Sequence, residues 1–367
     1  MRQRYLTALL LSLFLCLGIS SFDAFAKRDT ASVYRGHAVG FGLRPSYVIP
    51  THGFYNGWNP AGKHIRAGGS ADINYTFSNP DRGVYQGVGV AVHTFFSHDM
   101  LGTPATVYLF QGAPLALLAD NLSIGYEWNL GLSAGWKNNS VVTISPLNIY
   151  INVAALFTWR VSRYWDVVFG PEYTHFSNGD TRFPNGGANT LNFRIGARRH
   201  FHEVGKLKPE RIFKSSEGPL HKMTYDLLIY GGWRADRFLS EGRLEIVNKA
   251  FPVAGLNFNP LYHFNDYWSA GPSLDLIYDE SANAASHGFL SHSAAGISAR
   301  AELKMPIFAV NIGIGYNLLH EGQDLKGAYG MFSLKAFVTE RLFLNVGYRL
   351  STVLYAHNLM FGLGVRL

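Results

Sequence analysis

Residues 357–367 read HNLMFGLGVRL, and apolar side chains alternate along this stretch with polar or small ones. The apolar face holds every second residue: Leu359, Phe361, Leu363, Val365 and Leu367. Residues 308–318 (FAVNIGIGYNL) and 341–350 (RLFLNVGYRL) repeat the pattern. A two-residue period is that of a β-strand with one apolar and one polar face. The chain is therefore predicted to be built from such strands.

The lengths of the strands and of their connections favour a barrel that crosses a membrane. We predict about sixteen strands from this periodicity, at residues 36–48, 69–79, 84–97, 104–112, 121–134, 149–160, 164–177, 189–201, 224–235, 252–264, 267–279, 294–304, 307–318, 328–338, 341–351 and 357–367. Many segments have about ten to twelve residues, enough to cross a bilayer at a tilt. Several connections are short, at 162–163, 265–266, 305–306 and 339–340, and others are long, at 49–68, 135–148, 236–251 and 280–293. This asymmetry predicts an all-β fold, a transmembrane antiparallel outer-membrane β-barrel with its short turns in the periplasm.

The composition excludes two broad classes. Only 16% of the residues are charged, whereas 47% are hydrophobic and 14% aromatic. Soluble domains usually carry about a quarter charged residues. The mean hydropathy of +0.02 is too low for a bundle of transmembrane helices. The formal charge of +7 is spread along the chain, so we expect anionic lipid head groups as partners and no nucleic acid.

The first residues are predicted to be a secretory signal peptide, residues 1–26. Arg2 and Arg4 precede an apolar stretch, and residues 24–26 (AFA) form a small-residue cleavage site. A membrane anchor is the alternative, but the stretch is short for spanning. The one cysteine, Cys16, lies in this segment and follows Leu15, which disfavours a lipoprotein signal. We expect export to the outer membrane of a Gram-negative cell and a mature chain without disulfides.

The polar stretch 203–221 divides the chain into halves, residues 27–202 and 222–367. The sequence NTLNFRIGARRHF closes the first half and HNLMFGLGVRL closes the second, which suggests a duplication. One barrel of 12–16 strands is the first expectation from the strand count. The alternative is an eight-stranded barrel with an appended β unit.

A possible catalytic group lies in residues 164–189, YWDVVFGPEYTHFSNGDTRFPNGGAN. His175 and Ser177 share a strand face with apolar residues, so both are predicted on the lipid side near the strand end. Side chains two apart on one face are within hydrogen-bond reach, and His175 can act as base toward Ser177. If the hairpin closes in register, Asn189 lies beside His175 and can hold its tautomer. The alternative is a polar strand end at the membrane rim without chemistry.

HFSNG at 175–179 followed by PNGGAN at 184–189 resembles the signature of the lipid A 3-O-deacylase (PagL-type acyloxyacyl hydrolase) family. The resemblance implies an outer-membrane barrel that removes an ester-linked acyl chain from lipid A. It implies Ser177 as nucleophile, His175 as base, and Asn178 and Asn185 in oxyanion stabilisation. Backbone N–H groups of Gly179 and Gly186 are further donors that we expect there. The resemblance is strong over residues 164–189 and loose over the first half, and the second half lies outside it.

One residue departs from the family pattern, because the deacylases usually have an acidic residue at the position of Asn189. The outer-membrane phospholipase A family has an H-x-S-N-G motif too, with an Asn at this spacing. A Ser-His-Asn triad acting on lipid A is therefore the first reading. A phospholipase, calcium-dependent and dimeric if the likeness is close, is the second. A non-catalytic pore or structural barrel is the third, and the oligomeric state stays open.

Arginines near the motif are expected to play two roles. Arg182, in the loop, is the better contact for lipid A phosphates. Arg194 and Arg198 are predicted in the barrel interior, paired with carboxylates such as Asp166 or Glu172. The sequence has no recognised metal or cofactor motif, so neither is expected.

Overall fold

A computed structural model describes residues 36–78, 85–137, 145–179, 181–182, 185–204, 222–240, 243–265, 267–283, 293–304, 308–321, 325–351 and 355–367. The predicted signal peptide 1–26 and most of the connector 203–221 lie outside these residues. The sixteen strands are β1 (Ala38–Ile49), β2 (Ala67–Ser78), β3 (Tyr85–Thr94), β4 (Gly102–Ala119), β5 (Leu122–Trp136), β6 (Leu147–Arg160), β7 (Trp165–Ser177), β8 (Ala188–His200), β9 (Lys222–Ser240), β10 (Arg243–His263), β11 (Trp268–Asp279), β12 (Ser293–Lys304), β13 (Phe308–His320), β14 (Gly327–Phe337), β15 (Leu342–Ser351) and β16 (Tyr355–Arg366). Short helices are η2 (Gly53–Tyr55), α2 (His98–Leu101) and η4 (Glu280–Asn283). No helix among the described residues has the length and apolarity needed to cross a membrane.

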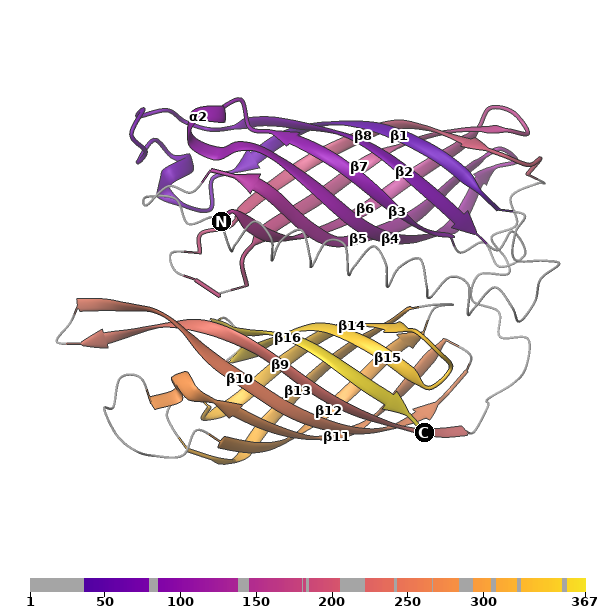
Figure 1. Cartoon of the computed structure of the whole chain (residues 1–367). Helices are drawn as coiled ribbons and strands as arrows, with labels where there is room; N and C mark the ends of the chain where they lie inside the picture. The colour runs from indigo at the N-terminus through magenta and orange to yellow at the C-terminus, as the bar shows by residue number, and fades with distance from the viewer. Residues whose placement is uncertain are drawn as a thin grey trace. The chain divides into compact units, whose positions relative to one another are not determined.

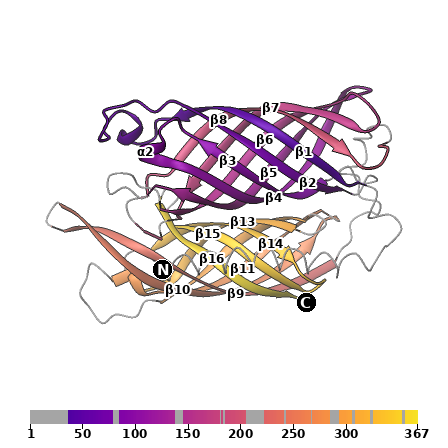
Figure 2. The same ribbon diagram turned by 45° about the horizontal axis from the view of Figure 1, so that its top comes forward.

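The strands close as two separate barrels of eight, β1–β8 and β9–β16 (Figure 1). In the first barrel β1 pairs with β2 on one side and with β8 on the other, and β16 pairs with β9 in the second. The prediction of an all-β antiparallel barrel fold is confirmed, but the single barrel of 12–16 strands is wrong. The alternative expected an eight-stranded barrel with an appended β unit, and that second unit is itself a closed barrel. Alternation determines which face of a strand is apolar, whereas closure depends on which edge strands pair. Figure 2 shows the same two closed sheets from a second direction.

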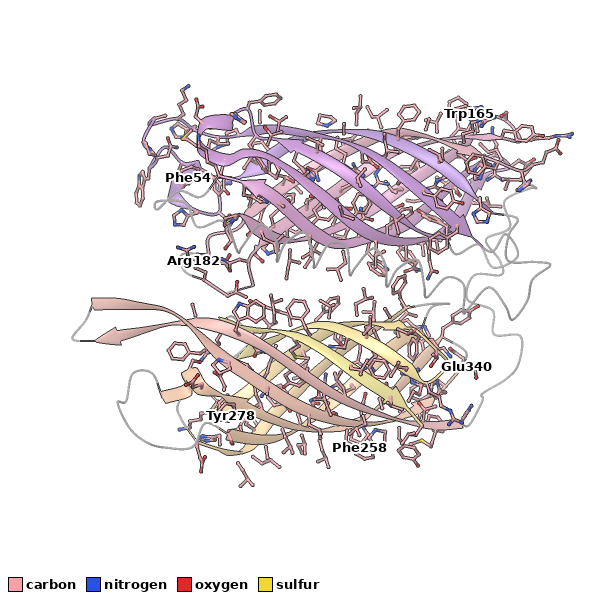
Figure 3. The ribbon with its side chains drawn as sticks, viewed as in Figure 1. Phe54, Trp165, Arg182, Phe258, Tyr278 and Glu340 are labelled. Atoms are coloured by element: carbon pink, nitrogen blue, oxygen red, sulfur yellow. The ribbon has the colours of Figure 1, made fainter. Side chains whose placement is uncertain are left out.

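The outer faces of both barrels are apolar and the inner faces are polar. On the outer face of β1, Phe41 and Leu43 are 57% and 61% exposed. Arg44 follows Leu43 on the inner face and is 2% exposed. Trp165 of the first barrel and Tyr278 of the second project outward in Figure 3. This is the alternation of outer-membrane barrels, whose outer surface meets hydrocarbon. Closure leaves no unpaired strand edge in that surface.

Buried ion pairs fill the interior of the first barrel. Arg44 contacts Asp72 at 2.5 Å and Glu172 at 2.8 Å. Arg194 contacts Glu127 at 2.7 Å and also Glu172. Each charge is out of water and is stabilised only by its partners, so the network depends on every member. These side chains occupy the space that a wide pore would need.

The expected pairing of Arg194 with Glu172 is confirmed, whereas the expected pairing of Arg198 is not. Arg198 does not pair with Asp166 or Glu172; its nearest carboxylate is that of Glu127 at 3.9 Å. The Asp166 carboxylate instead contacts Arg160 at 2.9 Å and His200 at 2.7 Å. The alternation of side chains along β8 predicted correctly that Arg194 and Arg198 face the interior. The carboxylate that each arginine meets depends on the tilt of the strands around the barrel.

The second barrel has its own buried charges. Arg366 and Lys335 each lie 2.7 Å from Asp226, and Lys335 lies 2.5 Å from Glu302. Of the residues 236–251, predicted as a loop, 236–240 and 243–251 are strand in β9 and β10, so this prediction is wrong for them. The segment carries many polar residues, and a strand that extends beyond the apolar belt needs no continuous apolar face.

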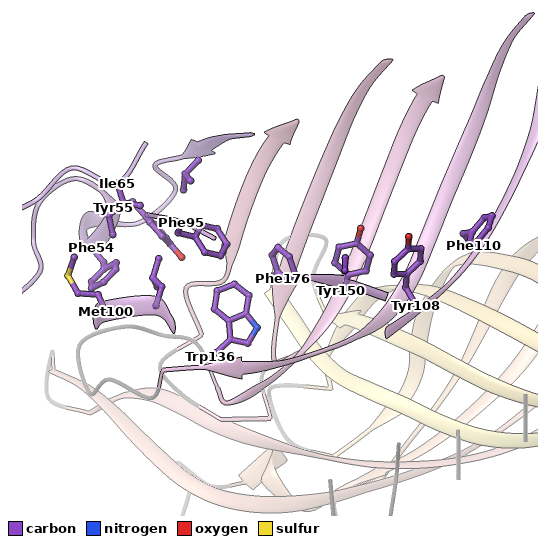
Figure 4. Packing of buried hydrophobic residues seen from close by; sticks show 14 residues of the cluster. Phe54, Tyr55, Ile65, Phe95, Met100, Tyr108, Phe110, Trp136, Tyr150 and Phe176 are labelled. Atoms are coloured by element: carbon purple, nitrogen blue, oxygen red, sulfur yellow. The ribbon is translucent and has the colours of Figure 1, made fainter. Parts of the chain in front are cut away.

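An aromatic cluster closes the long-loop end of the first barrel (Figure 4). Phe176 of β7 lies 5.0 Å from Trp136 and 5.1 Å from His93, measured between ring centroids. Phe54 and Tyr55 of η2 belong to the same cluster and are fully buried. Phe176 is therefore fixed on the inner face, and its neighbours His175 and Ser177 necessarily take the outer face.

Candidate active site

His175 and Ser177 lie at the end of β7 on the outer face of the first barrel. Thr174 and Phe176 are 3% and 1% exposed on the inner face, whereas Tyr173 is 38% exposed on the outer one. His175 and Ser177 are half-buried. The end of β7 leads into the connection 178–187, on the same end of the barrel as the 50–66 connection. The two side chains therefore lie on the apolar surface near the long-loop rim.

The register of β7 and β8 pairs His175 directly with Asn189, as the sequence predicted. Asn189 Oδ1 lies 2.7 Å from His175 Nδ1, so Nδ1 carries the proton and donates it to the amide oxygen. In the neutral ring, the second nitrogen, Nε2, is then the one without a proton and can act as a base. Asn189 is 9% exposed, so this contact is shielded from water.

Two further side chains hold the Asn189 amide. The Tyr173 hydroxyl donates to Asn189 Oδ1 at 2.6 Å. Asn189 Nδ2 donates to Thr51 Oγ1 at 3.1 Å. Ile49, the last residue of β1, pairs with Asn189, and Thr51 follows two residues later. The amide therefore has partners from β7 and from the β1–β2 connection.

Gly187 packs against both His175 and Ser177. A Cβ on Gly187 would lie 3.5 Å from His175 Cε1 and 3.8 Å from Ser177 Cβ. The residue has φ +61°, and its carbonyl accepts a hydrogen bond of 2.8 Å from Tyr55 Oη. Burial raises the pKa of Tyr55, so its hydroxyl remains a donor. The η2 helix thus fixes the turn that faces His175 and Ser177.

The loop after Ser177 is held by its asparagines. The backbone N–H of Asn178 donates to Asn185 Oδ1 at 3.3 Å. Asn178 Nδ2 donates to Ser145 Oγ and to the Arg182 carbonyl, each at 2.8 Å. These contacts engage the Asn178 donors in holding the loop. The oxygen contact of Asn185 orients the rest of its amide, which carries the donor atoms.

The structure brings His175 and Asn189 into contact and places Ser177 on the same outer face, where Gly187 lies next to both His175 and Ser177. No hydrogen bond joins His175 to Ser177 among the described residues. Asn178, Gly179, Asn185 and Gly186 lie in the adjoining turn. The exposed Arg182 lies on the same loop (Figure 3). Sequence reasoning missed Thr51, Tyr55, Tyr173 and Gly187 as members of the site. Tyr173 had a signal, because it shares the strand face of His175. Among the described residues, no cluster of three His, Cys, Asp or Glu could hold a metal ion.

Comparison with known protein families finds a match that covers the second barrel. Residues 223–367 match the family model described as acyloxyacyl hydrolase, C-terminal domain. The chain is similar to PagL-type acyloxyacyl hydrolases. The resemblance to this family is thus confirmed, but the expectation that the second half lies outside it is wrong. The motif at 175–189 lies outside the matched residues. No curated protein matches the chain.

Several solved outer-membrane barrels are similar at low identity. Neisserial surface protein A is 11% identical, with a TM-score of 0.32 over 45% of this chain and 97% of its own. The outer membrane enzyme PagL is 12% identical, with a TM-score of 0.29 over 43% of this chain and 97% of its own. Outer membrane phospholipase A from Escherichia coli is 8% identical, with a TM-score of 0.17 over 94% and 96%.

Each barrel ends in a hairpin that pairs a tyrosine with a leucine, but the residues that follow the two tyrosines differ in chemistry. Tyr173 pairs with Leu191 in the first barrel, and Tyr348 pairs with Leu359 in the second. Two residues after Tyr173 comes His175, whereas two residues after Tyr348 comes Leu350. The His-x-Ser pair is therefore a feature of the first barrel at this position.

Proposed function

We propose that the chain is an outer-membrane serine esterase that removes an ester-linked acyl chain from lipid A. The contact between His175 Nδ1 and Asn189 Oδ1 on the apolar outer face carries this proposal. It leaves Nε2 able to accept a proton, two residues from a hydroxyl on the same face. The family match supports an acyloxyacyl hydrolase, although it covers residues 223–367.

In the proposed mechanism, Ser177 Oγ attacks the ester carbonyl carbon while His175 Nε2 takes the hydroxyl proton. The tetrahedral intermediate expels the alcohol of the substrate, which takes that proton from His175. A water molecule then gives a proton to His175 and attacks the acyl-enzyme carbonyl. The bond from the acyl carbon to Ser177 Oγ breaks, the fatty acid leaves, and His175 returns the proton to Ser177 Oγ. Asn189 holds the ring and stabilises the imidazolium throughout.

The developing oxyanion needs hydrogen-bond donors from the turn that follows Ser177. The Asn185 amide and the backbone N–H groups of Gly179 and Gly186 are our proposed donors. Asn178 contributes by holding this turn, through Ser145 and the Arg182 carbonyl. The role that the motif resemblance gave to Asn178 is thus an indirect one.

The position of the site fits a substrate that stays in the bilayer. Acyl chains would lie against the apolar outer face, and the ester would meet Ser177 near the long-loop rim. In outer-membrane barrels the long loops face outward, so we propose that the site lies in the leaflet that holds lipid A. We propose Arg182, exposed on the adjoining loop, as a contact for its phosphates. Export by the segment 1–26 belongs to the same proposal.

A second candidate function is phospholipase A activity on glycerophospholipids. The observation that favours it is Asn189, the amide that stands where the deacylases usually have an acid. The chemistry of both reactions is the same, so the substrate decides between them.

Mass spectrometry of lipid A and phospholipids tests both. The samples are outer membranes of cells that make the wild-type chain, Ser177→Ala or His175→Ala. We expect loss of one acyl chain from lipid A with the wild type alone. Lysophospholipids instead would support the second function. Unchanged lipids in all three, with the barrels present in the membrane, would refute both.

A further inference from the structure

A triad whose third member is an asparagine has an orientation problem that a carboxylate lacks. A carboxylate presents two equivalent acceptor oxygens, whereas an amide has one oxygen acceptor and one nitrogen donor. Rotating the amide of Asn189 by half a turn would present Nδ2 to His175. The ring would then have to accept at Nδ1 and carry its proton on Nε2. In that tautomer it could not take the proton of Ser177.

We propose that Tyr173 and Thr51 are positioning residues that hold the Asn189 oxygen toward His175 and so fix the productive tautomer. The inference rests on the proposed esterase function and deepens it. Tyr173 Oη and His175 Nδ1 both approach Asn189 Oδ1, at 2.6 Å and 2.7 Å. The 2.6 Å contact from the Tyr173 hydroxyl lies in the range of O–H···O hydrogen bonds and is shorter than the usual N–H···O hydrogen bond that a reversed amide would make there.

The chemistry of the two hydroxyls gives the amide its direction. A phenol hydroxyl is more acidic than an aliphatic one, so Tyr173 is the better donor and Thr51 the better acceptor. Tyr173 lies on the oxygen side of the amide and Thr51 on the nitrogen side. Asn189 is 9% exposed, so water would not compensate a reversed amide. Tyr173 thus helps to keep the Asn189 oxygen toward His175. A carboxylate would need no such help, because both of its oxygens are acceptors.

Strand pairing places Tyr173 and Asn189, and the start of the β1–β2 connection places Thr51. Tyr173 precedes His175 by two residues and shares its outward face. Asn189 pairs with His175 on one side and with Ile49 on the other, which brings the start of the β1–β2 connection to the amide. The support therefore comes from the adjacent strands β7 and β8 and from the first residues after β1.

A double-mutant cycle separates this role from ordinary packing. Tyr173→Phe is made in the wild-type chain and in Asn189→Asp, and kcat and KM are measured on the purified full chain with its ester substrate. In the wild-type background we expect kcat to fall about three- to tenfold, the effect of one hydrogen bond, with KM little changed. In the Asn189→Asp background, Tyr173→Phe should lower kcat by less than about twofold. A carboxylate rotated by half a turn still presents an acceptor oxygen to His175. Thr51→Val should behave as Tyr173→Phe does.

Tyr47→Phe is the matched control. Tyr47 also pairs with Leu191, from β1, so it lies at the depth of Tyr173, and its hydroxyl bonds to none of the described residues. We expect it to leave kcat unchanged. An equal loss from Tyr173→Phe in both backgrounds, or no loss in the wild-type background, would overturn the inference while leaving the esterase function intact. A wild-type chain without any hydrolysis would refute the proposed function and the inference with it.

Discussion

Gly187→Ala should damage catalysis as well as folding, whereas a glycine in the same conformation away from the site should affect folding alone. The added Cβ would lie 2.8 Å from the backbone oxygen of Phe176, too close for a carbon and a backbone atom, and 3.5 Å from His175 Cε1. The turn must therefore move, by about 0.5 Å in a close-packed site. A displacement of about 1 Å of a reacting group costs roughly a hundredfold in rate, so we expect kcat/KM to fall about tenfold. That loss corresponds to about 1.4 kcal/mol.

Gly62→Ala is a matched control for the backbone strain. Gly62 has the same φ of +61°, but nothing lies within 4 Å of its added Cβ. Both variants pay roughly 1–2 kcal/mol for the left-handed conformation. Ester hydrolysis by the purified chain and its urea unfolding in detergent measure the two effects. Wild-type kcat/KM in Gly187→Ala, or an equal loss in Gly62→Ala, would refute the view that this turn sets the geometry of His175 and Ser177.

Three further predictions concern the supports of the site. Tyr55→Phe leaves the Gly187 carbonyl without its donor and should cost about 1 kcal/mol in the free energy of unfolding. Because burial raises the pKa of Tyr55, the wild-type contribution should persist below the unfolded pKa near 10 and decline only above it, as unfolding at several pH values would show. Arg194→Met should cost about 3–5 kcal/mol in a urea titration, since it leaves Glu172 buried with one partner fewer; an unchanged midpoint would contradict this. Arg182→Ala should raise KM for lipid A with little change in kcat, and an unchanged KM would remove Arg182 from head-group binding.

Strand faces could be predicted from the sequence because burial follows a two-residue period. The outward placement of His175 and Ser177, and the pairing of His175 with Asn189, both follow from that period and from a regular hairpin. Closure into two barrels could not be predicted in the same way. The pairs that decide it join β1 to β8 and β9 to β16, and the alternation of each strand is the same whichever edge it meets.

The supports of the site depend on contacts between distant parts of the chain. Tyr55 is 132 residues from Gly187, and Thr51 is 138 residues from Asn189. A loop residue carries no periodic signal, so nothing in the local pattern of residues 50–66 indicates that it reaches β8. Tyr173 differs, because its parity with His175 is local and could have been used.

The family match and the proposed site lie in different barrels, and the physical basis of each signal explains this. The alternation that recurs in β15 and β16 is required of any strand that faces lipid, so a barrel can keep it after its chemistry changes. Catalysis depends on a few side chains, and the position of His175 is held by Leu350 in the second barrel. An aliphatic side chain cannot take a proton, so the second barrel has no base there. Ser177→Ala in the intact chain should therefore abolish hydrolysis completely, and residual activity in that variant would place a second site in β9–β16.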